Sequence, residues 1–194
     1  MASQLQRTNP VQSRLEALSQ LPDGFRVTVE PFLAMTNLRC QSGGPAADRV
    51  AAVLGLTPPA QPNTWSRSDD GSVVWLGPDE WLVISELATP EAQEAGLRAV
   101  IVPYGGAAVD VSGQRVTLLL RGRNVRDVLA KGCALDLHHT VFRPGSSAAT
   151  TVGRAGVVLL AGEDPAEFAV LVRQSFASYL ADWLIDAAEE FRPA

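Results

Sequence analysis

The chain repeats one order of predicted elements twice, and this internal repeat constrains the fold more than any single motif. Each half contains an extended segment, a short helix, a polar linker, a hairpin of two strands and a second helix. One half begins at Arg26 and the other begins at Arg115. Such a duplication predicts an α+β fold built from two strand-helix-hairpin-helix modules with antiparallel sheets.

Proline, glycine and serine clusters separate the predicted elements. Those of the first half are an extended segment over residues 26–40, a helix that stops at Gly55, a linker over residues 60–72, a hairpin over residues 73–84 and a helix that begins at Thr89. Those of the second half are a strand over residues 115–121, a helix capped by Asn124, a loop over residues 143–151, strands over residues 157–161 and 168–172, and a helix from Ser175. We therefore expect modules at residues 25–108 and 109–194 that form one compact domain.

Residues 1–24 precede the repeat and predict a docking arm. Val11, Leu15 and Leu18 form a short apolar stripe on a helix that begins near Pro10. Because so short a helix is unstable alone in water, we expect its stripe to lie on a neighbouring subunit. Val11, Leu15 and Leu18 are therefore candidate interface residues.

Residues 165–190 allow two interpretations. The apolar spacing from Phe168 to Ala187 fits a helical stripe, and residues 164–167 resemble a capping box, so one helix could cover the whole segment. The repeat instead favours a strand followed by a helix, and Ser175 offers a second N-cap. We favour the strand and helix, because the first half has a hairpin at the same place.

Residues 73–84 read VVWLGPDEWLVI, with two tryptophans flanking a Gly-Pro-Asp-Glu segment. Superposing the halves places Trp75 against Leu159 and Trp81 against Phe168. The equivalent tip of the second half also holds Gly, Asp, Pro and Glu, which are residues that turns use. A catalytic acid pair would have no reason to recur in both halves, so the acidic pair at residues 79–80 is predicted to form a turn.

The length of this turn decides where the two indoles point. A three-residue loop over residues 78–80 puts both on one face of the hairpin, whereas a four-residue loop over residues 77–80 puts them on opposite faces. We favour the four-residue loop. One indole would then enter the core and the other would face a partner, so Trp75 and Trp81 join the candidate interface residues.

Composition and charge argue against two classes of partner. The net charge is −5 and no cluster of Lys and Arg occurs, whereas nucleic-acid binding requires a concentrated basic surface. The apolar runs at residues 116–120 and 157–161 are far shorter than the ~20 residues of a membrane span. The N-terminal residues MASQLQRTNP lack the apolar core of a signal peptide, so we expect a cytoplasmic protein.

Residues that could bind a metal or carry out catalysis are sparse. Cys40 and Cys133 lie far apart outside any CxxC motif and are expected to be buried free thiols. His138 and His139 are adjacent, stand at no ligand spacing, and are expected on a surface loop. Neither a dinucleotide-binding glycine motif nor a phosphate-binding P-loop occurs. We expect no catalytic, metal-binding or cofactor-binding residues on this chain.

The octapeptide WLGPDEWL at residues 75–82 resembles the gamma subunit family of heterotetrameric sarcosine oxidase. The other matching stretches follow in the same order within residues 26–192: Val-Asp-Val-Ser at residues 109–112, residues 129–132 and 135–137, Phe142, and Arg-Gln-Ser-Phe-Ala at residues 173–177. The resemblance implies a fold similar to the folate-binding domain of glycine-cleavage aminomethyltransferase, in which two modules exchange their first strands.

The resemblance also implies a function. The chain would be a non-catalytic subunit that supports assembly of a complex that oxidatively demethylates sarcosine to glycine, with peroxide formation and one-carbon transfer to tetrahydrofolate. The implied partners are the alpha, beta and delta subunits, chiefly alpha. FAD, FMN, NAD, tetrahydrofolate and zinc are implied for those subunits, and none for this chain.

A second function shares the same fold, namely that of a free-standing folate-binding protein of the aminomethyltransferase and iron-sulfur-cluster maintenance superfamily. The aminomethyltransferase places its catalytic aspartate just after a glycine at the start of a strand. Here Gly71 is followed by Ser-Val-Val-Trp. Residues 131–133 match the Lys-Gly-Cys start of the cluster-maintenance signature but continue as Ala-Leu-Asp-Leu. Both departures favour the gamma subunit.

Overall fold

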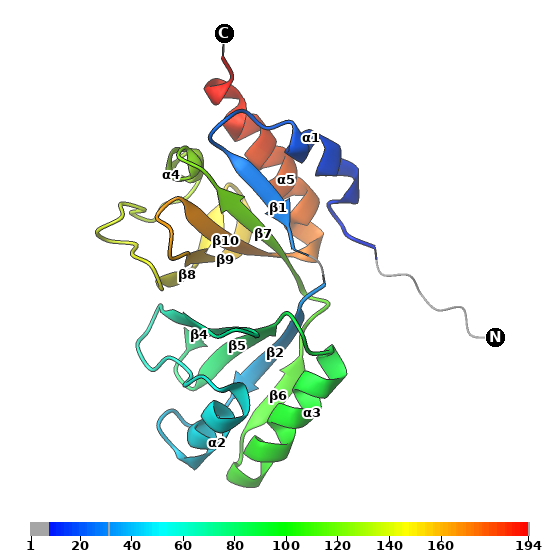
Figure 1. The fold of residues 1–194 in the computed structure, drawn as a ribbon, viewed down its shortest axis with the longest axis vertical. Helices are drawn as coiled ribbons and strands as arrows, with labels where there is room; N and C mark the ends of the chain where they lie inside the picture. Colours follow the sequence, from blue (N-terminus) through cyan, green and yellow to red (C-terminus); the bar gives the residue numbers. More distant parts are fainter. Residues whose placement is uncertain (1–7, 31, 194) are drawn as a thin grey trace, which may run out of the picture.

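Two antiparallel sheets of five strands each form the framework of the chain, which the computed structural model describes for residues 8–30 and 32–193. Sheet A contains β1 (Arg26–Val29), β7 (Arg115–Arg121), β8 (Ser147–Val152), β9 (Ala155–Ala161) and β10 (Glu167–Arg173). Sheet B contains β2 (Ala34–Arg39), β3 (Trp65–Arg67), β4 (Gly71–Gly77), β5 (Glu80–Ser85) and β6 (Ala107–Asp110). The strand orders are β1-β7-β10-β9-β8 and β3-β4-β5-β2-β6, and the sheets occupy separate parts of the molecule (Figure 1).

Helices lie on the outer side of each sheet (Figure 1). Those beside sheet A are α1 (Leu15–Ser19), α4 (Val125–Ala130) and α5 (Gln174–Ala188), with 3-10 turns at Gln12–Arg14 and Glu189–Phe191. Those beside sheet B are α2 (Pro45–Leu54) and α3 (Pro90–Ile101), with a 3-10 turn at Val102–Tyr104. The left-handed Gly55 ends α2 at φ 62°. Within the described ranges, no helix has the length and apolar character needed to cross a membrane.

The two halves of the chain exchange their first strands. β1 pairs with β7 of the second half, and β6 pairs with β2 of the first half. The exchange implied by the family resemblance is therefore confirmed. Sheet B consequently uses the continuous stretch of residues 34–110, whereas sheet A combines β1 with residues 115–173. The extended element predicted over residues 26–40 is in fact two strands, which belong to different sheets. The sequence did not show this division, because side-chain alternation does not identify the partner strand.

The closing segment is a strand followed by a helix, as the repeat predicted. β10 ends at Arg173 and α5 begins at Gln174, so the alternative of one helix over residues 165–190 is wrong. β10 lies inside sheet A and pairs with both β7 and β9. These two ladders satisfy the backbone hydrogen-bonding groups of β10 on both sides, which a helix would have to satisfy internally.

Two short strands lie where the sequence predicted no regular structure. β3 falls inside the predicted linker over residues 60–72, and β8 begins inside the predicted loop over residues 143–151. Both are edge strands that pair on one side only. Edge strands keep polar side chains in solvent, so they lack the apolar alternation by which strands are recognised.

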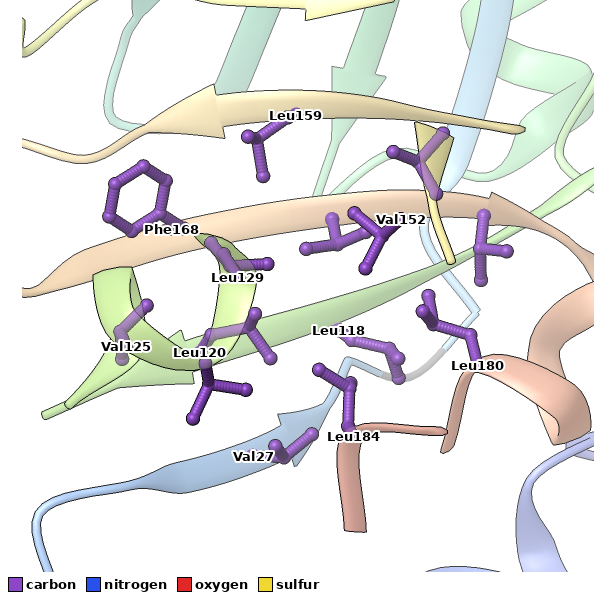
Figure 2. Close-up of a cluster of buried hydrophobic side chains, with 14 of the residues drawn as sticks. Val27, Leu118, Leu120, Val125, Leu129, Val152, Leu159, Phe168, Leu180 and Leu184 are labelled. Atoms are coloured by element: carbon purple, nitrogen blue, oxygen red, sulfur yellow. The ribbon is translucent and has the colours of Figure 1, made fainter. Parts of the chain in front are cut away.

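The larger hydrophobic core lies between sheet A and its helices. Figure 2 shows side chains from sheet A, α4 and α5 converging on one cluster. Its labelled members are Val27, Leu118, Leu120, Val125, Leu129, Val152, Leu159, Phe168, Leu180 and Leu184. Leu118, Leu159 and Phe168 have no exposed surface. Each buried side chain of this size contributes about 1.5–3 kcal/mol, so this cluster is the main source of hydrophobic stabilisation in this half.

The inner faces of the two sheets pack against each other. The buried side chains between them are Met35, Val74, Leu82, Ile84, Val111, Val158, Leu160 and Leu171. Hydrogen bonds reinforce the contact at two places. The Met35 N–H donates to the Ser112 hydroxyl at 2.8 Å, and the Trp65 indole N–H donates to the Ala161 carbonyl at 2.9 Å. The sheets therefore form one packed unit.

The N-terminal arm packs on its own chain. Val11 and Leu18 are 0% and 3% exposed within the core of sheet A, and Leu15 packs beside them. An ion pair at 3.0 Å joins Arg14 to Asp182 of α5. The stripe that we expected on a neighbouring subunit therefore has its complementary surface in the second half of the chain. Residues 1–7 of the predicted arm lie outside the described residues.

Two glycines of the first half offer a paired test of how closely β4 approaches β5. A Cβ at Gly71 would lie 1.9 Å from the Ile84 carbonyl oxygen, whereas a Cβ at Gly96 in α3 would meet nothing within 4 Å. We expect Gly71→Ala to lower the free energy of unfolding by at least about 2 kcal/mol, because the backbone of β5 must move. Gly96→Ala should raise it by about 0.5–1 kcal/mol through helix propensity. Urea unfolding measures both, and a stable Gly71→Ala variant would contradict the β4–β5 register.

Candidate functional site

The β4–β5 hairpin carries the family-like octapeptide, and its turn is shorter than either predicted loop. Trp75 lies directly opposite Trp81, and Gly77 lies opposite Glu80. The loop therefore contains two residues, and a register shift between Trp75 and Gly77 leaves Leu76 as a bulge. The favoured four-residue loop is wrong, and both indoles lie on one face of the hairpin. A bulge shifts the alternation of side chains by one residue, but residues 73–76 are all apolar, so the sequence does not reveal the shift.

Both tryptophans pack on the core between sheet B, α2 and α3. Trp81 is 1% exposed, and its indole N–H donates to the Pro59 carbonyl at 2.8 Å. Trp75 is half-buried against the same core. The two indoles therefore do not lie on opposite faces, and Trp75 keeps partly exposed surface while Trp81 is buried. In the second hairpin Phe168 lies opposite Ala161, so Ala161, and not Leu159, occupies the place of Trp75.

The acidic pair of the octapeptide is engaged within the chain. Asp79 adopts φ 58°, and its carboxylate accepts the Ser42 N–H at 2.6 Å. The Glu80 carboxylate accepts a hydrogen bond from the Asn37 amide at 2.8 Å and one from Arg39 at 2.6 Å. The pKa of Glu80 is lowered by the bond from Asn37, against the opposing effect of burial, and further by Arg39. Both carboxylates therefore have structural roles.

A cleft of about 220 Å³ opens between the two sheets. Apolar residues of both sheets form its walls, and charged residues line its rim. The rim contains two ion pairs, Arg67 with Glu86 at 3.2 Å and Arg121 with Glu167 at 2.7 Å. Thr117 also lines the cleft, and its hydroxyl has no hydrogen-bond partner among the described residues. Because each rim arginine is paired, the cleft presents no free cation to a phosphate-bearing ligand.

The histidines and cysteines form no reactive group. His138 and His139 are exposed on a loop with ring centroids 4.3 Å apart, and His138 Nδ1 lies 2.7 Å from the Thr140 hydroxyl. Cys40 and Cys133 are buried free thiols, as predicted. Burial, with a smaller effect of Asp79, raises the pKa of Cys40 and makes its thiolate less accessible. No metal-binding group of three or more His, Cys, Asp or Glu occurs in residues 8–30 and 32–193.

The stretch Val-Asp-Val-Ser lies where the chain crosses from sheet B to sheet A. The Asp110 carboxylate accepts hydrogen bonds from the Ser112 N–H and hydroxyl at 2.9 and 2.6 Å. The Ser112 hydroxyl in turn accepts from Met35 at the neighbouring crossover. These bonds hold the segment that connects the two sheets. The Ser112 hydroxyl is used in them and, within the described residues, has no histidine beside it to act as a base.

The turn supports a stability prediction for Asp79. We expect Asp79→Ala to lower the free energy of unfolding by about 1–2 kcal/mol, because it loses the bond to Ser42 and places Ala at positive φ. Asp79→Gly should lose less, since glycine removes the backbone strain. Glu163→Ala, in an exposed turn of the second half, is the control and should change stability by less than about 0.5 kcal/mol. Equal losses in Asp79→Ala and Asp79→Gly would contradict the role of positive φ.

The lowered pKa of Glu80 predicts a dependence of stability on pH. The ionised carboxylate stabilises the fold above its unfolded pKa of about 4.3, and this contribution is lost as pH falls through the lower folded value. Between about pH 5 and pH 3, the free energy of unfolding of the wild-type chain should therefore fall more steeply than that of Glu80→Gln. Parallel curves from urea titrations across this range would contradict the prediction.

Comparisons with known proteins agree with these features. The model of the "Sarcosine oxidase, gamma subunit family" matches residues 39–190. The sarcosine oxidase subunit gamma of an Arthrobacter species is 32% identical over 188 residues, which cover 95% of this chain and 91% of that protein. The subunit gamma of Corynebacterium sp. strain P-1 is 32% identical over 190 residues, with the same coverage of both chains.

Solved structures confirm the predicted fold. A chain of the heterotetrameric sarcosine oxidase from Corynebacterium sp. U-96, in complex with pyrrole 2-carboxylate, superposes with a TM-score of 0.88, at 27% identity and 97% coverage of both chains. The glycine cleavage system aminomethyltransferase T from Bartonella henselae superposes with a TM-score of 0.61 at 13% identity, over 88% of this chain and 48% of that one, and shares the fold alone. With the family model matched across most of the sequence, this chain belongs to the sarcosine oxidase gamma subunit family.

Proposed function

We propose that this chain is the non-catalytic gamma subunit of a heterotetrameric sarcosine oxidase and that it supports assembly of the complex. The complex would oxidatively demethylate sarcosine to glycine, with peroxide formation and one-carbon transfer to tetrahydrofolate. Membership in the gamma subunit family supports this proposal, together with the similarity to a chain of the heterotetrameric enzyme from Corynebacterium sp. U-96.

One observation supports the non-catalytic role above the others. The acidic residues of the octapeptide are the pair that a catalytic reading of this sequence would choose, and both are engaged in bonds within the chain. Asp79 holds the Ser42 N–H, and Glu80 holds Asn37 and Arg39. The hydrogen bonds from Asn37 and Arg39 lower the pKa of Glu80, which makes Glu80 a poor general base at neutral pH.

The proposed partners are the alpha, beta and delta subunits, chiefly alpha, and we assign FAD, FMN, NAD, tetrahydrofolate and zinc to them. Of the five candidate interface residues, Leu15 and Trp75 keep partly exposed surface in this chain. We retain these two as proposed contacts.

Co-expression tests the assembly role. A tagged copy of this chain, produced with the alpha, beta and delta subunits of the same organism, should retain all three on an affinity column and yield a flavin absorption spectrum. Omitting this chain should lower the recovery of the assembled complex. Recovery of a complete, active complex without it would contradict a role in assembly.

Substitution in that complex tests the non-catalytic role. Asp79→Asn and Glu80→Gln should each leave kcat for sarcosine within about twofold of wild type, whereas loss of a general acid or base costs about 10²–10⁴-fold.

Calorimetry on the isolated chain tests the alternative function, that of a free-standing folate-binding protein. Heat of tetrahydrofolate binding to this chain alone would favour a free-standing folate-binding protein.

A further inference from the structure

Two arginines face each other at the ends of neighbouring strands of sheet A. Arg115 begins β7 and Arg173 ends β10, and the strand register makes them direct partners. Arg115 is half-buried and Arg173 is exposed. Across the part of the chain that the structure describes, neither forms an ion pair with a carboxylate. Like charges in direct cross-strand positions are destabilising, so this pair is unfavourable in the isolated chain.

The N-terminus of α5 adds positive potential at the same place. The 15-residue α5 begins at Gln174, immediately after Arg173. Arg173 occupies the N-cap position without a capping bond from its side chain, and the first turn contains no acidic residue. The helix dipole places partial positive charge at this end of α5, where the Gln174 N–H already donates to the Gln114 carbonyl at 3.0 Å and the next N–H groups have no partners within the helix. Helix starts of this kind bind anions.

An unpartnered buried hydroxyl lies beside this group. Thr117 follows Arg115 by two positions on β7, so both side chains project from the same face. Thr117 is 6% exposed, and its hydroxyl has no hydrogen-bond partner among residues 8–30 and 32–193. Arg115, Thr117 and Gln174 all line one cavity of about 30 Å³. A buried hydroxyl without a partner costs free energy, and an oxygen-bearing ligand would satisfy it.

Two carboxylates lie near this pair of arginines, and each also acts on another arginine. Glu80 exerts an attraction on Arg115, but its oxygens are bonded to Asn37 and Arg39. Glu30 lines the same cavity, and its charge acts on Arg121 at the other end of β7. Burial and then the charge of Arg173 lower the pKa of Arg115, which Glu80 opposes. The cluster thus carries an excess of positive charge on a chain whose net charge is −5.

We propose that Arg115, Arg173 and the N-terminus of α5 form a binding site for a carboxylate, filled by an Asp or Glu side chain of a partner subunit. The occupant follows from size and charge. A cavity of about 30 Å³ admits the end of a side chain but no complete metabolite, and the exposed Arg173 lies next to it as the strand partner of Arg115. The local excess of positive charge is complementary to an acidic partner. The choice of occupant rests on the proposed function, whereas the site itself rests on the geometry.

The first test measures binding to the remaining subunits. The variant Arg115→Gln/Arg173→Gln keeps hydrogen-bond donors, and it should fold at least as well as wild type because it removes a repulsion. Arg49→Gln is the matched control, since Arg49 is an exposed arginine of α2 that forms no ion pair within the described part of the chain. We expect the double variant to bind the alpha, beta and delta subunits about tenfold or more weakly, with a shallower salt dependence, and the control to change Kd by less than about twofold. Equal Kd for the double variant and wild type, or an equal loss in the control, would overturn the proposal.

The second test uses acetate as a free carboxylate and separates the site from its occupant. Acetate should raise the Tm of the isolated wild-type chain above its value in chloride at equal ionic strength, and the double variant should lose this difference. An acetate effect that depends on the two arginines, combined with unchanged binding of the other subunits, would assign the site to a free carboxylate and overturn the partner assignment. If wild type binds no other subunit, the proposed function fails, and the acetate result alone decides whether the site exists.

Discussion

Backbone pairing between the two halves holds this structure together. β1 finds its neighbour in β7, and β6 finds its neighbour in β2, so each sheet is completed by a strand that the opposite half of the sequence supplies. The two crossings are bonded to each other through Met35 and Ser112, and the inner faces of the sheets share one apolar cluster. A change at either crossing therefore acts on both sheets, and the cleft between them keeps its shape only while both exchanges persist.

The remaining features use this framework in two ways. Apolar residues of the arm and the first hairpin are buried in the chain's own cores, as Val11 and Trp81 show. Charged residues on the inner faces of the sheets are paired in most cases, as in Arg121 with Glu167. Arg115 and Arg173 depart from this rule. Complementarity to other subunits is therefore better sought in charge at the junction of the sheets than in the apolar residues that first suggested an interface.

The repeat predicted the fold well, because each half served as a test of the other. The strand before α5 was identified in this way, although periodicity alone also allowed a helix. The sequence did not predict features that depend on a single residue or on which surfaces meet. The bulge at Leu76 reverses the face of Trp75, and no apolar pattern reveals it. The stripe at Val11 and Leu18 indicated burial but not against which surface. Arg115 and Arg173 are opposite each other because of the register between β7 and β10. The sequence predicts both strands but does not show that they are neighbours, so it does not reveal this pair.

The exchange also imposes an order on synthesis of the protein. As the chain leaves the ribosome from its N-terminus, β1 emerges before the whole of sheet B but finds its neighbour only when β7 follows at residues 115–121. Sheet B is complete once residue 110 has emerged, whereas sheet A must await β10. An early strand thus stays unpaired while a finished layer forms beside it. Nascent chains stalled before β7 has emerged would carry β1 without its neighbouring strand, available to chaperones or to a wrong neighbour.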